Sequence, residues 1–342
     1  MWQLIKREIG KTQEDDYKFE LKIGNNVILN PIKITEKLNM YFVNTLTELV
    51  QQNINKGSYN NSRQEIKHCP NSIFISPVAD EEVVSTAKNL KDKLTTGFDD
   101  IPESLVKQCI QLIKGPLTHI YNLSLRSGSF PYEWKLAKVK TLYKKGDKYD
   151  IQHCRPISII SVFAKLLERL MFNRFIPFLY ENKILTEAQY CLRKGKCIET
   201  AVQSFIVKIQ EALDKAFHLI GIFIGLTKAY DTLNHIVLLE ILSSYEIRGI
   251  MNLRFKSYLT NRRQCIEINQ SDSNNVMVSR YRSSCMEIKQ VVPHGSVLGP
   301  LLFLLYLNYL PLNIHGANLV MFADGINVLI MDRDVCALQR KN

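Results

Sequence analysis

The stretch VMFADGINVL, from Val320 to Leu329, has the pattern of a β-hairpin. Two apolar runs flank an Asp-Gly pair, which is among the strongest two-residue hairpin signals. The glycine accepts the positive φ that a type I′ turn requires. We therefore predict two antiparallel strands joined at Asp324–Gly325. A plain turn accounts for this pair by itself, so the rest of the chain must decide whether the tip also formed a site with two adjacent carboxylates.

The composition of the 342-residue chain is that of a globular protein, because 46% of the residues are hydrophobic and 23% are charged. The formal net charge of +11 favours a polyanionic partner, such as nucleic acid or an anionic membrane surface. On charge alone, a merely basic soluble protein is an equally good interpretation.

The cysteines and the apolar segments bear on the cellular location. The eight cysteines include no CxxC pair, which argues against a zinc site. No signal peptide is recognisable, so we predict a reducing, intracellular location in the nucleus or the cytoplasm. The stretch Val297–Leu310 is too short for a membrane span and contains Asn308, so we predict a buried helix there and no membrane partner.

The order of the predicted elements indicates an α+β fold rather than a doubly wound one. Residues 34–52 have the spacing of an amphipathic helix, and the polar residues 53–65 are typical of an exposed linker. Further helices are predicted for residues 81–90, 103–113, 160–175, 199–213 and 235–245, and strands for residues 136–145, 265–268 and 276–279.

Two of these segments carry more specific predictions. Residues 217–226 are apolar and bounded by polar residues, which favours a central strand buried on both faces. Residues 136–145 predict a strand with one basic side, because Lys138, Lys140 and Lys144 alternate with less polar residues. Neither GxGxxG nor GxxxxGK[ST] occurs, so a phosphate loop at a helix start has no support.

Four stretches together point to a known family: residues 143–170, 222–235 (IFIGLTKAYDTLNH), 291–311 (VVPHGSVLGPLLFLLYLNYLP) and the hairpin. In this order and spacing they resemble the reverse transcriptases of non-LTR retrotransposons, the LINE class, and most closely the jockey-like branch. The resemblance runs from about residue 35 to about residue 331.

The resemblance implies a right-hand polymerase fold with the fingers and most of the palm, and with the thumb missing. It assigns residues 1–68 to a segment upstream of the polymerase, 69–215 to the fingers and the start of the palm, and 216–342 to a palm truncated before the thumb. It implies RNA-templated DNA synthesis, with an RNA template, a DNA primer and deoxynucleoside triphosphates as partners. It indicates no particular protein partner.

The resemblance also implies three aspartates that hold two Mg²⁺ ions, because magnesium takes hard oxygen ligands. Here Gly225 stands at the end of the palm strand, where the family has the first aspartate. The hairpin keeps Asp324, but Gly325 stands at its neighbour. Two of the three metal-ligand positions are therefore lost, and we predict that this copy is catalytically inactive or nearly so. Asp231 is more simply explained as a turn or cap residue.

The resemblance assigns nucleotide and template contacts to further side chains: Lys144, Lys145, Arg155, Tyr230, His294, Gly295 and Ser296. Simpler interpretations remain open, because the three cations also suit a solvated basic face and Tyr230 also suits an ordinary core position. Gly225 also suits a strand end that needs little space. Two alternative functions stay open as well, a non-catalytic nucleic-acid-binding protein and a functionless retroelement remnant.

Overall fold

The structure is a computed structural model and has a mixed α and β architecture. It describes residues 20–24, 26–54, 71–143, 146–147, 149–226, 233–271, 278–288, 292–293 and 295–334, and only the backbone of residues 46–54, 271 and 278.

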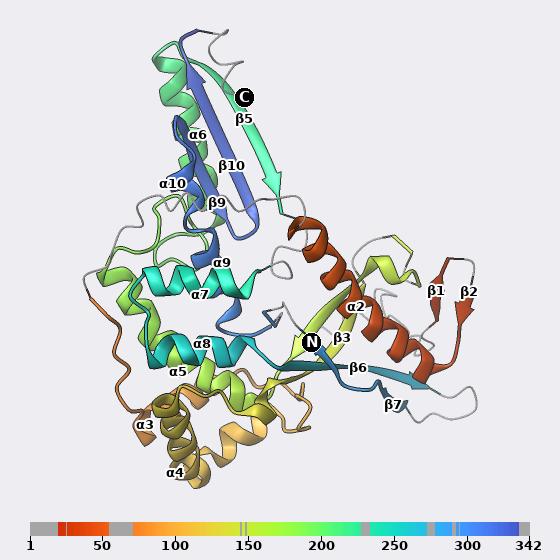
Figure 1. Cartoon of the computed structure of the whole chain (residues 1–342). Coiled ribbons are helices and arrows are strands. Elements are labelled where there is room, and N and C mark those ends of the chain that lie inside the picture. Colours follow the sequence, from red (N-terminus) through yellow and green to blue (C-terminus); the bar gives the residue numbers. More distant parts are fainter. Residues whose placement is uncertain are drawn as a thin grey trace, which may run out of the picture.

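The helices alternate with strands along the whole described chain (Figure 1). The α-helices are α2 (Pro31–Ile54), α3 (Asp80–Lys88), α4 (Glu103–Ser127), α5 (Val162–Glu181), α6 (Ile198–Asp214), α7 (His235–Ser244), α8 (Ile250–Leu259), α9 (Gly299–Leu307) and α10 (Leu310–Asn313). The short 3₁₀ helices are η1 (Tyr132–Lys135) and η2 (Ile151–His153). The strands are β1 (Leu21–Ile23), β2 (Asn26–Ile28), β3 (Leu136–Tyr143), β4 (Cys154–Ile159), β5 (His218–Gly225), β6 (Arg262–Ser271), β7 (Val278–Arg282), β8 (Met286–Ile288), β9 (Ala317–Phe322) and β10 (Gly325–Asp332).

The larger sheet joins strands that are distant in the sequence. Its order is β4-β3-β6-β7, with β8 also paired to β6. The β3–β4 pair is antiparallel, whereas β3 and β6 run parallel. Helix α2 crosses this sheet (Figure 1), and Leu38 and Phe42 of α2 pack with Val139 of β3 and Ile266 of β6. This packing ties the two halves of the chain together.

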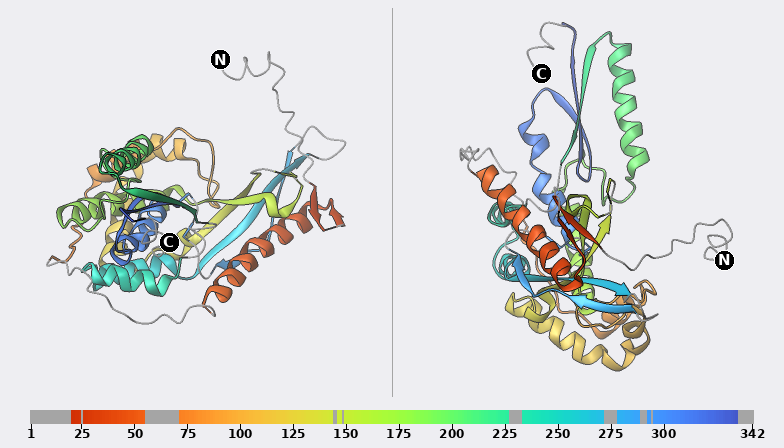
Figure 2. Two further views of the ribbon diagram at one scale, coloured as in Figure 1. Left: turned by 90° about the horizontal axis from the view of Figure 1, so that it is seen from above. Right: turned by 90° about the vertical axis from the view of Figure 1, so that its right-hand side faces the viewer.

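The smaller sheet has the order β5-β10-β9, and both of its strand pairs are antiparallel. Together with α6 it projects from the rest of the molecule, as the right-hand view of Figure 2 shows. Its own small core contains Met321, Ile326, Val328 and Ile330. Two predicted catalytic positions lie on this pair, because Gly225 ends β5 and Gly325 begins β10. This end of the β5–β10 pair is the one that meets the main body (Figure 1).

The main core lies among helices α3, α4, α5, α7, α8 and α9. Helix α9 is buried almost all round, as its uniform apolar sequence requires, and Leu301, Leu302 and Leu305 are fully inaccessible. The sequence prediction of a buried helix is thus confirmed. Within the described residues, no helix is long and apolar enough to cross a membrane.

Most predicted elements are confirmed. The predicted helix at residues 34–52 lies within α2, and the hairpin, the 136–145 strand and the helices at 160–175, 199–213 and 235–245 correspond to elements of the structure. Most of the predicted linker at residues 53–65 lies outside the described residues. The helix predicted at 103–113 is longer than expected, because α4 continues through Pro116. Leu117, Tyr121 and Leu125 are spaced four residues apart and are all buried, so core packing offsets the hydrogen bond that the proline cannot donate.

The prediction of a central strand at residues 217–226 is wrong. Among the strands that the structure describes, β5 lies at the edge of its sheet and pairs only with β10. Phe223 is 70% exposed and Ile224 is 43% exposed. A short apolar run predicts a strand but not the number of its neighbours, because the covering layers come from distant parts of the chain.

The predicted basic side of residues 136–145 also differs from the structure. Lys138 is buried rather than solvated, and its ammonium nitrogen lies 3.4 Å from Glu267 and 3.3 Å from Asp100. The parallel pairing of β3 with β6 brings Glu267 close to Lys138, a contact that alternation within one strand does not reveal.

Candidate active site

The β5–β10 pairing brings the two glycines of interest face to face. Gly225, the last residue of β5, is the direct partner of Gly325, the first residue of β10. Directly opposed residues of antiparallel strands point to the same face of the sheet, with Cβ atoms about 4.5–5.5 Å apart. Side chains at 225 and 325 would therefore lie next to each other on one face.

Position 225 has room for a larger residue, whereas a larger residue at position 325 makes one tight contact with the backbone. A Cβ built on Gly225 meets no atom of the described residues within 4 Å, and one built on Gly325 lies 3.3 Å from the carbonyl oxygen of Phe322. Neither glycine has a positive φ. The backbone φ therefore does not require glycine at these two positions. The described residues around Gly225 also leave space for a side chain, so they do not explain a glycine at this strand end.

The hairpin turn differs from the predicted one. Gly325 is already paired with Phe322, so the central residues of the turn are Ala323 and Asp324 rather than Asp324 and Gly325. The positive φ belongs to Ala323, at 52°. A type I′ turn needs positive φ at both central residues, so the predicted turn type is wrong. Asp324 is exposed at the tip, and its carbonyl oxygen accepts a hydrogen bond from the Leu226 amide at 3.0 Å.

The loop that precedes α6 packs against the hairpin. The Tyr190 amide donates to the Met321 carbonyl at 2.9 Å, and the Met321 amide donates to Ala188 at 2.8 Å. Burial raises the pKa of the Cys191 thiol, and the nearby Asp324 carboxylate adds to the increase. The neighbours of Asp324 thus include a protonated thiol, which is no ligand for a hard cation.

The described residues do not form a site for two metal ions. Asp324 contributes one carboxylate, and no group of three or more His, Cys, Asp or Glu side chains in the described part of the chain is arranged to hold a metal. Two ions require several oxygen ligands, so this donor set does not fit such a site.

Gly295 and Ser296 form a tightly constrained loop before α9. Gly295 has a φ of 102°, and a Cβ there would lie 2.6 Å from the carbonyl oxygen of Ser158 in β4. Only glycine fits this position. The Ser296 hydroxyl accepts a hydrogen bond from the amide of Gly299, the first residue of α9, at 3.0 Å.

A buried carboxylate from α5 holds the same loop. Glu168 is fully inaccessible, and its Oε2 accepts hydrogen bonds from the amides of Val297 at 2.6 Å and Leu298 at 3.2 Å. Burial raises the pKa of Glu168, while the nearby Arg262 guanidinium and these amides oppose the increase. The loop geometry therefore depends on a carboxyl group that is held away from water.

Further polar groups surround Glu168. The Arg262 side chain is 1% exposed and donates to the Tyr258 carbonyl at 3.1 Å. Burial and the same guanidinium lower the pKa of His235 to about 4, so its ring is neutral at neutral pH. The sequence analysis missed this network. A detectable signal was Glu168 on the buried face of α5, between Ala164 and Met171 at helical spacing.

The remaining predicted residues are only partly described. Arg155 lies on β4, is exposed and pairs through its backbone with Leu142. Lys144, Lys145, Tyr230 and His294 lie outside the described residues, as does Asp231. The structure thus brings Gly225, Asp324 and Gly325 together, and it places Gly295 and Ser296 against β4 and α5.

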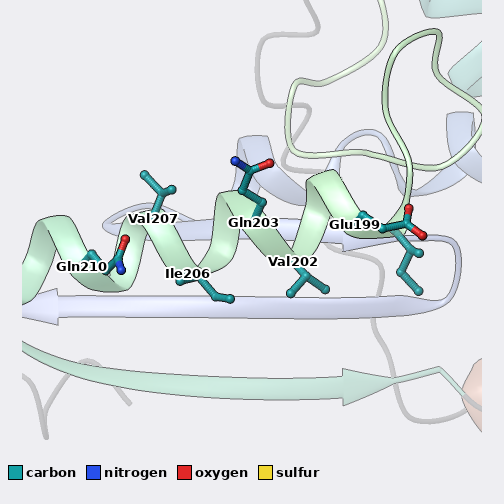
Figure 3. Close-up of a pocket in the computed structure, with 7 residues that line it drawn as sticks. Glu199, Val202, Gln203, Ile206, Val207 and Gln210 are labelled. Carbon is teal, nitrogen blue, oxygen red and sulfur yellow. The ribbon is translucent and has the colours of Figure 1, made fainter.

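A separate hollow on α6 does not belong to this site. Its lining side chains, which include Val202, Ile206 and Gln210, all come from one helix (Figure 3). Val202 is 53% exposed and Ile206 is 48% exposed, so this is an open apolar face. It contains none of the predicted functional residues.

Comparison with known proteins explains this arrangement of strand, hairpin and loop. Residues 143–341 match the family described as Reverse transcriptase (RNA-dependent DNA polymerase). The chain belongs to the reverse transcriptase family. Members of this family use divalent metal ions, and the match contains β5, the hairpin and the Gly295–Ser296 loop.

Three of the similar proteins come from mobile elements of Drosophila melanogaster. The probable RNA-directed DNA polymerase from transposon BS is 31% identical over 244 residues, which is 70% of this chain and 25% of that protein. The probable RNA-directed DNA polymerase from transposon X-element is 27% identical over 268 residues, which is 76% of this chain and 28% of that protein. The RNA-directed DNA polymerase from mobile element jockey is 27% identical over 245 residues, which is 70% of this chain and 25% of that protein. The chain is thus a reverse transcriptase domain of the non-LTR retrotransposon type, and it spans about a quarter of the relatives it matches.

Proposed function

We propose that this chain is the polymerase part of a jockey-like element in which DNA synthesis on an RNA template has been lost. The observation that carries the proposal is the direct pairing of Gly225 with Gly325 beside Asp324. Aspartates at these two positions would place three carboxylates around one end of the β5–β10 pair. Oxygen ligands of that kind suit Mg²⁺, which we propose as the metal of the ancestral site.

We propose a right-hand polymerase architecture for this part of the chain. In this assignment, residues 69–215 contain the fingers and the start of the palm, and residues 216–342 contain the palm. The assignment is supported by β5 and the hairpin, which come from the second segment and share one sheet. Strands β6 and β8, also from the second segment, pair in the sheet that contains β3 and β4, so the two segments interlock.

We assign the remaining contacts by their chemistry. Lys144, Lys145 and Arg155 are proposed to bind phosphates of the nucleotide or the template, and Tyr230 to lie against the nucleotide sugar. His294, Gly295 and Ser296 are proposed to contact the template and the nucleotide. The rigid geometry of Gly295 and the Glu168 hydrogen bonds behind Val297 and Leu298 support a loop that must hold its shape.

The test is primer extension on a primed RNA template with Mg²⁺. We expect no extension by the wild-type chain and measurable extension by the double variant Gly225→Asp/Gly325→Asp. Removal of a single preorganised electrostatic group commonly costs about 10²–10³ in rate, and metal ligands act as a unit. A triple variant that also carries Asp324→Asn is the control and should be silent.

Two results would contradict the proposal. Extension by the wild-type chain would show that two carboxylates are not needed at these positions. Silence of both the wild-type chain and the double variant would show that the two glycines are not what separates this chain from an active one.

A further inference from the structure

Two free cysteines lie opposite each other at one point of the larger sheet. Cys265 belongs to β6, and Cys285 directly precedes β8. These two strands are antiparallel, and their last paired residues are Gln264 and Met286. The next step of the same register places Cys285 opposite Cys265. Neither cysteine belongs to the stretches from which the metal and nucleotide contacts were predicted.

A β-bulge interrupts the ladder at this point. The Ser283 amide donates a hydrogen bond to the Ile266 carbonyl at 3.0 Å. Between this bond and the β6–β8 pairs, β6 contributes Cys265 alone, whereas the opposite strand contributes both Ser284 and Cys285. The bulge therefore leaves two residues that could face Cys265.

The contacts of Ser284 favour Cys285 as the residue that faces Cys265. Ser284 turns toward α2, because its amide donates to Glu36 Oε1 at 2.7 Å and its hydroxyl donates to Oε2 at 2.9 Å. Ile266 packs with side chains of α2 as well, so its neighbour Cys265 points to the other face of the sheet. Since successive residues of an extended chain alternate between faces, Cys285 shares that face with Cys265.

The electrostatics of Cys265 agree with two neighbouring sulfur atoms. Burial raises the pKa of the Cys265 thiol to about 12, and the Cys285 thiol is the next largest cause of the increase. Glu267 adds to the increase, whereas Arg282 and Lys138 oppose it. Because a charge shifts a pKa most strongly from within about 4–6 Å, Cys285 acts as an immediate neighbour of Cys265.

The pair has the geometry and the accessibility that disulfide formation requires. Directly opposed residues of antiparallel strands have Cα atoms about 4.5–5.5 Å apart, and a disulfide spans Cα–Cα distances of about 4.4–6.8 Å. Cys285 is exposed, whereas Cys265 is fully inaccessible. A dissolved oxidant therefore reaches Cys285 first, and Cys265 is the thiol next to it.

We propose that Cys265 and Cys285 form a dithiol modification site, which a low-molecular-weight disulfide such as oxidised glutathione converts into an intramolecular disulfide. In the first step, the Cys285 thiolate attacks one glutathione sulfur, a mixed disulfide forms and a glutathione thiolate leaves. In the second step, the Cys265 thiolate attacks the Cys285 sulfur, and the bond to the second glutathione breaks. Two protein thiols are oxidised and one glutathione disulfide is reduced to two thiols. The two departing thiolates take up the protons that the cysteines lose.

The disulfide ties the start of β8 to β6. It closes a loop of the chain that contains β7, and it precedes the Gly295–Ser296 loop in the sequence. The inference goes beyond the proposed loss of DNA synthesis and does not rest on it, because the two cysteines lie in the larger sheet and the altered metal site lies in the smaller one.

The test treats the native chain with oxidised glutathione, blocks the remaining thiols with N-ethylmaleimide and maps the peptides by mass spectrometry without reduction. We expect the Cys265–Cys285 disulfide to exceed every other protein disulfide of Cys285 at least about tenfold, because pairs outside the permitted distance need backbone movement. The same reaction in urea should lose this preference, since the sheet that aligns the two thiols is then unfolded.

Two variants separate the two steps. Cys265→Ser should stop after the first step and retain glutathione on Cys285, whereas Cys285→Ser should leave Cys265 free of glutathione. The matched control is Cys197→Ser, which removes another exposed thiol and should leave the Cys265–Cys285 disulfide unchanged. Thermal melts establish that all three variants are folded.

Four results would overturn the inference. Wild-type chain that retains glutathione on Cys285 without closing the disulfide would show that the two sulfur atoms do not reach each other. An unreactive Cys285 would exclude oxidised glutathione as the oxidant. Reaction of Cys265 with glutathione in Cys285→Ser would show that Cys265 needs no partner to react. Pairing of Cys285 with a different cysteine, or equal selectivity in the native chain and in urea, would show that the sheet does not direct the bond.

Discussion

At the residue scale, we propose that two missing side chains account for the lost chemistry of the chain. Gly225 and Gly325 are not demanded by the backbone, in contrast to Gly295, where a Cβ would collide with Ser158. A glycine that sterics require and a glycine that sterics merely allow look the same in a sequence. The structure separates them by the backbone φ and by the space around each Cβ, and the loss of carboxylates at 225 and 325 is our proposal.

A second effect at this scale is the stability that Glu168 provides. Replacement by leucine leaves the Val297 and Leu298 amides and the nearby Arg262 without their buried carboxylate. We expect Glu168→Leu to lower the free energy of unfolding by about 3–5 kcal/mol. Glu168→Gln keeps an acceptor oxygen and should cost less than half as much. Urea denaturation of both variants measures the difference.

The control for Glu168 is an exposed ion pair. Glu81 lies 3.5 Å from Lys114 and its side chain is 82% exposed, so Glu81→Gln should change the unfolding free energy by no more than about 1 kcal/mol. Equal losses for Glu168→Leu and Glu168→Gln would contradict this account, because they would show that the acceptor oxygen kept by glutamine does not preserve the stability.

At the element scale, one polar residue joins two segments to the end of α9. The Asn308 carbonyl oxygen accepts from the Thr186 amide at 2.7 Å, and its amide nitrogen donates to the Ile184 carbonyl at 2.8 Å and the Tyr245 hydroxyl at 2.7 Å. Asn308→Leu removes all three bonds at a buried position. We expect a loss of about 2–4 kcal/mol in unfolding free energy, measured by chemical denaturation.

The matched variant is Asn313→Ala, whose amide donates to the Tyr309 carbonyl at 3.0 Å at an exposed position. Its expected cost is below about 1 kcal/mol, since water replaces the lost partner. A similar cost for Asn308→Leu would mean that the three segments are held by apolar packing alone.

The sequence predicted where most helices and strands lie, but it predicted their strand partners and their burial less well. Periodicity identified α2, α5 and α6, because apolar spacing is a local property. It did not predict that β5 lies at an edge, that Lys138 is buried against Glu267, or that Ala323 carries the positive φ of the turn. Each of these depends on a strand that pairs from a distant part of the chain or on the register of that pairing.

The sequence predicted which residues belong to the candidate site, but not how they are arranged in space. The resemblance identified positions 225, 324 and 325, and the register of β5 with β10 is consistent with one shared site. Glu168 was missed. Its effect comes from the approach of α5 to the loop before α9, which no local pattern encodes.

At the scale of the whole molecule, the small sheet and the helical body have unequal cores. The cluster inside the β5–β10–β9 sheet is much smaller than the one among α3, α4, α5, α7, α8 and α9. We expect the β5 amides that bond to β10 to exchange hydrogen through openings of lower free energy than the amides of α5 and α8. Peptide-resolved hydrogen exchange measures this, and equal protection would show that the projecting part unfolds only with the rest.

The central claim is that positions 225 and 325 are emptied metal-ligand positions of one site. It is tested most directly by titrating Mn²⁺ into the wild-type chain and into Gly225→Asp/Gly325→Asp, with free Mn²⁺ followed by electron paramagnetic resonance. We predict at least about tenfold tighter binding by the double variant, and loss of that gain when Asp324→Asn is added, because even outer partners of a metal change its affinity by about 10–100-fold. Equal, weak binding by the wild-type chain and the double variant would contradict the claim.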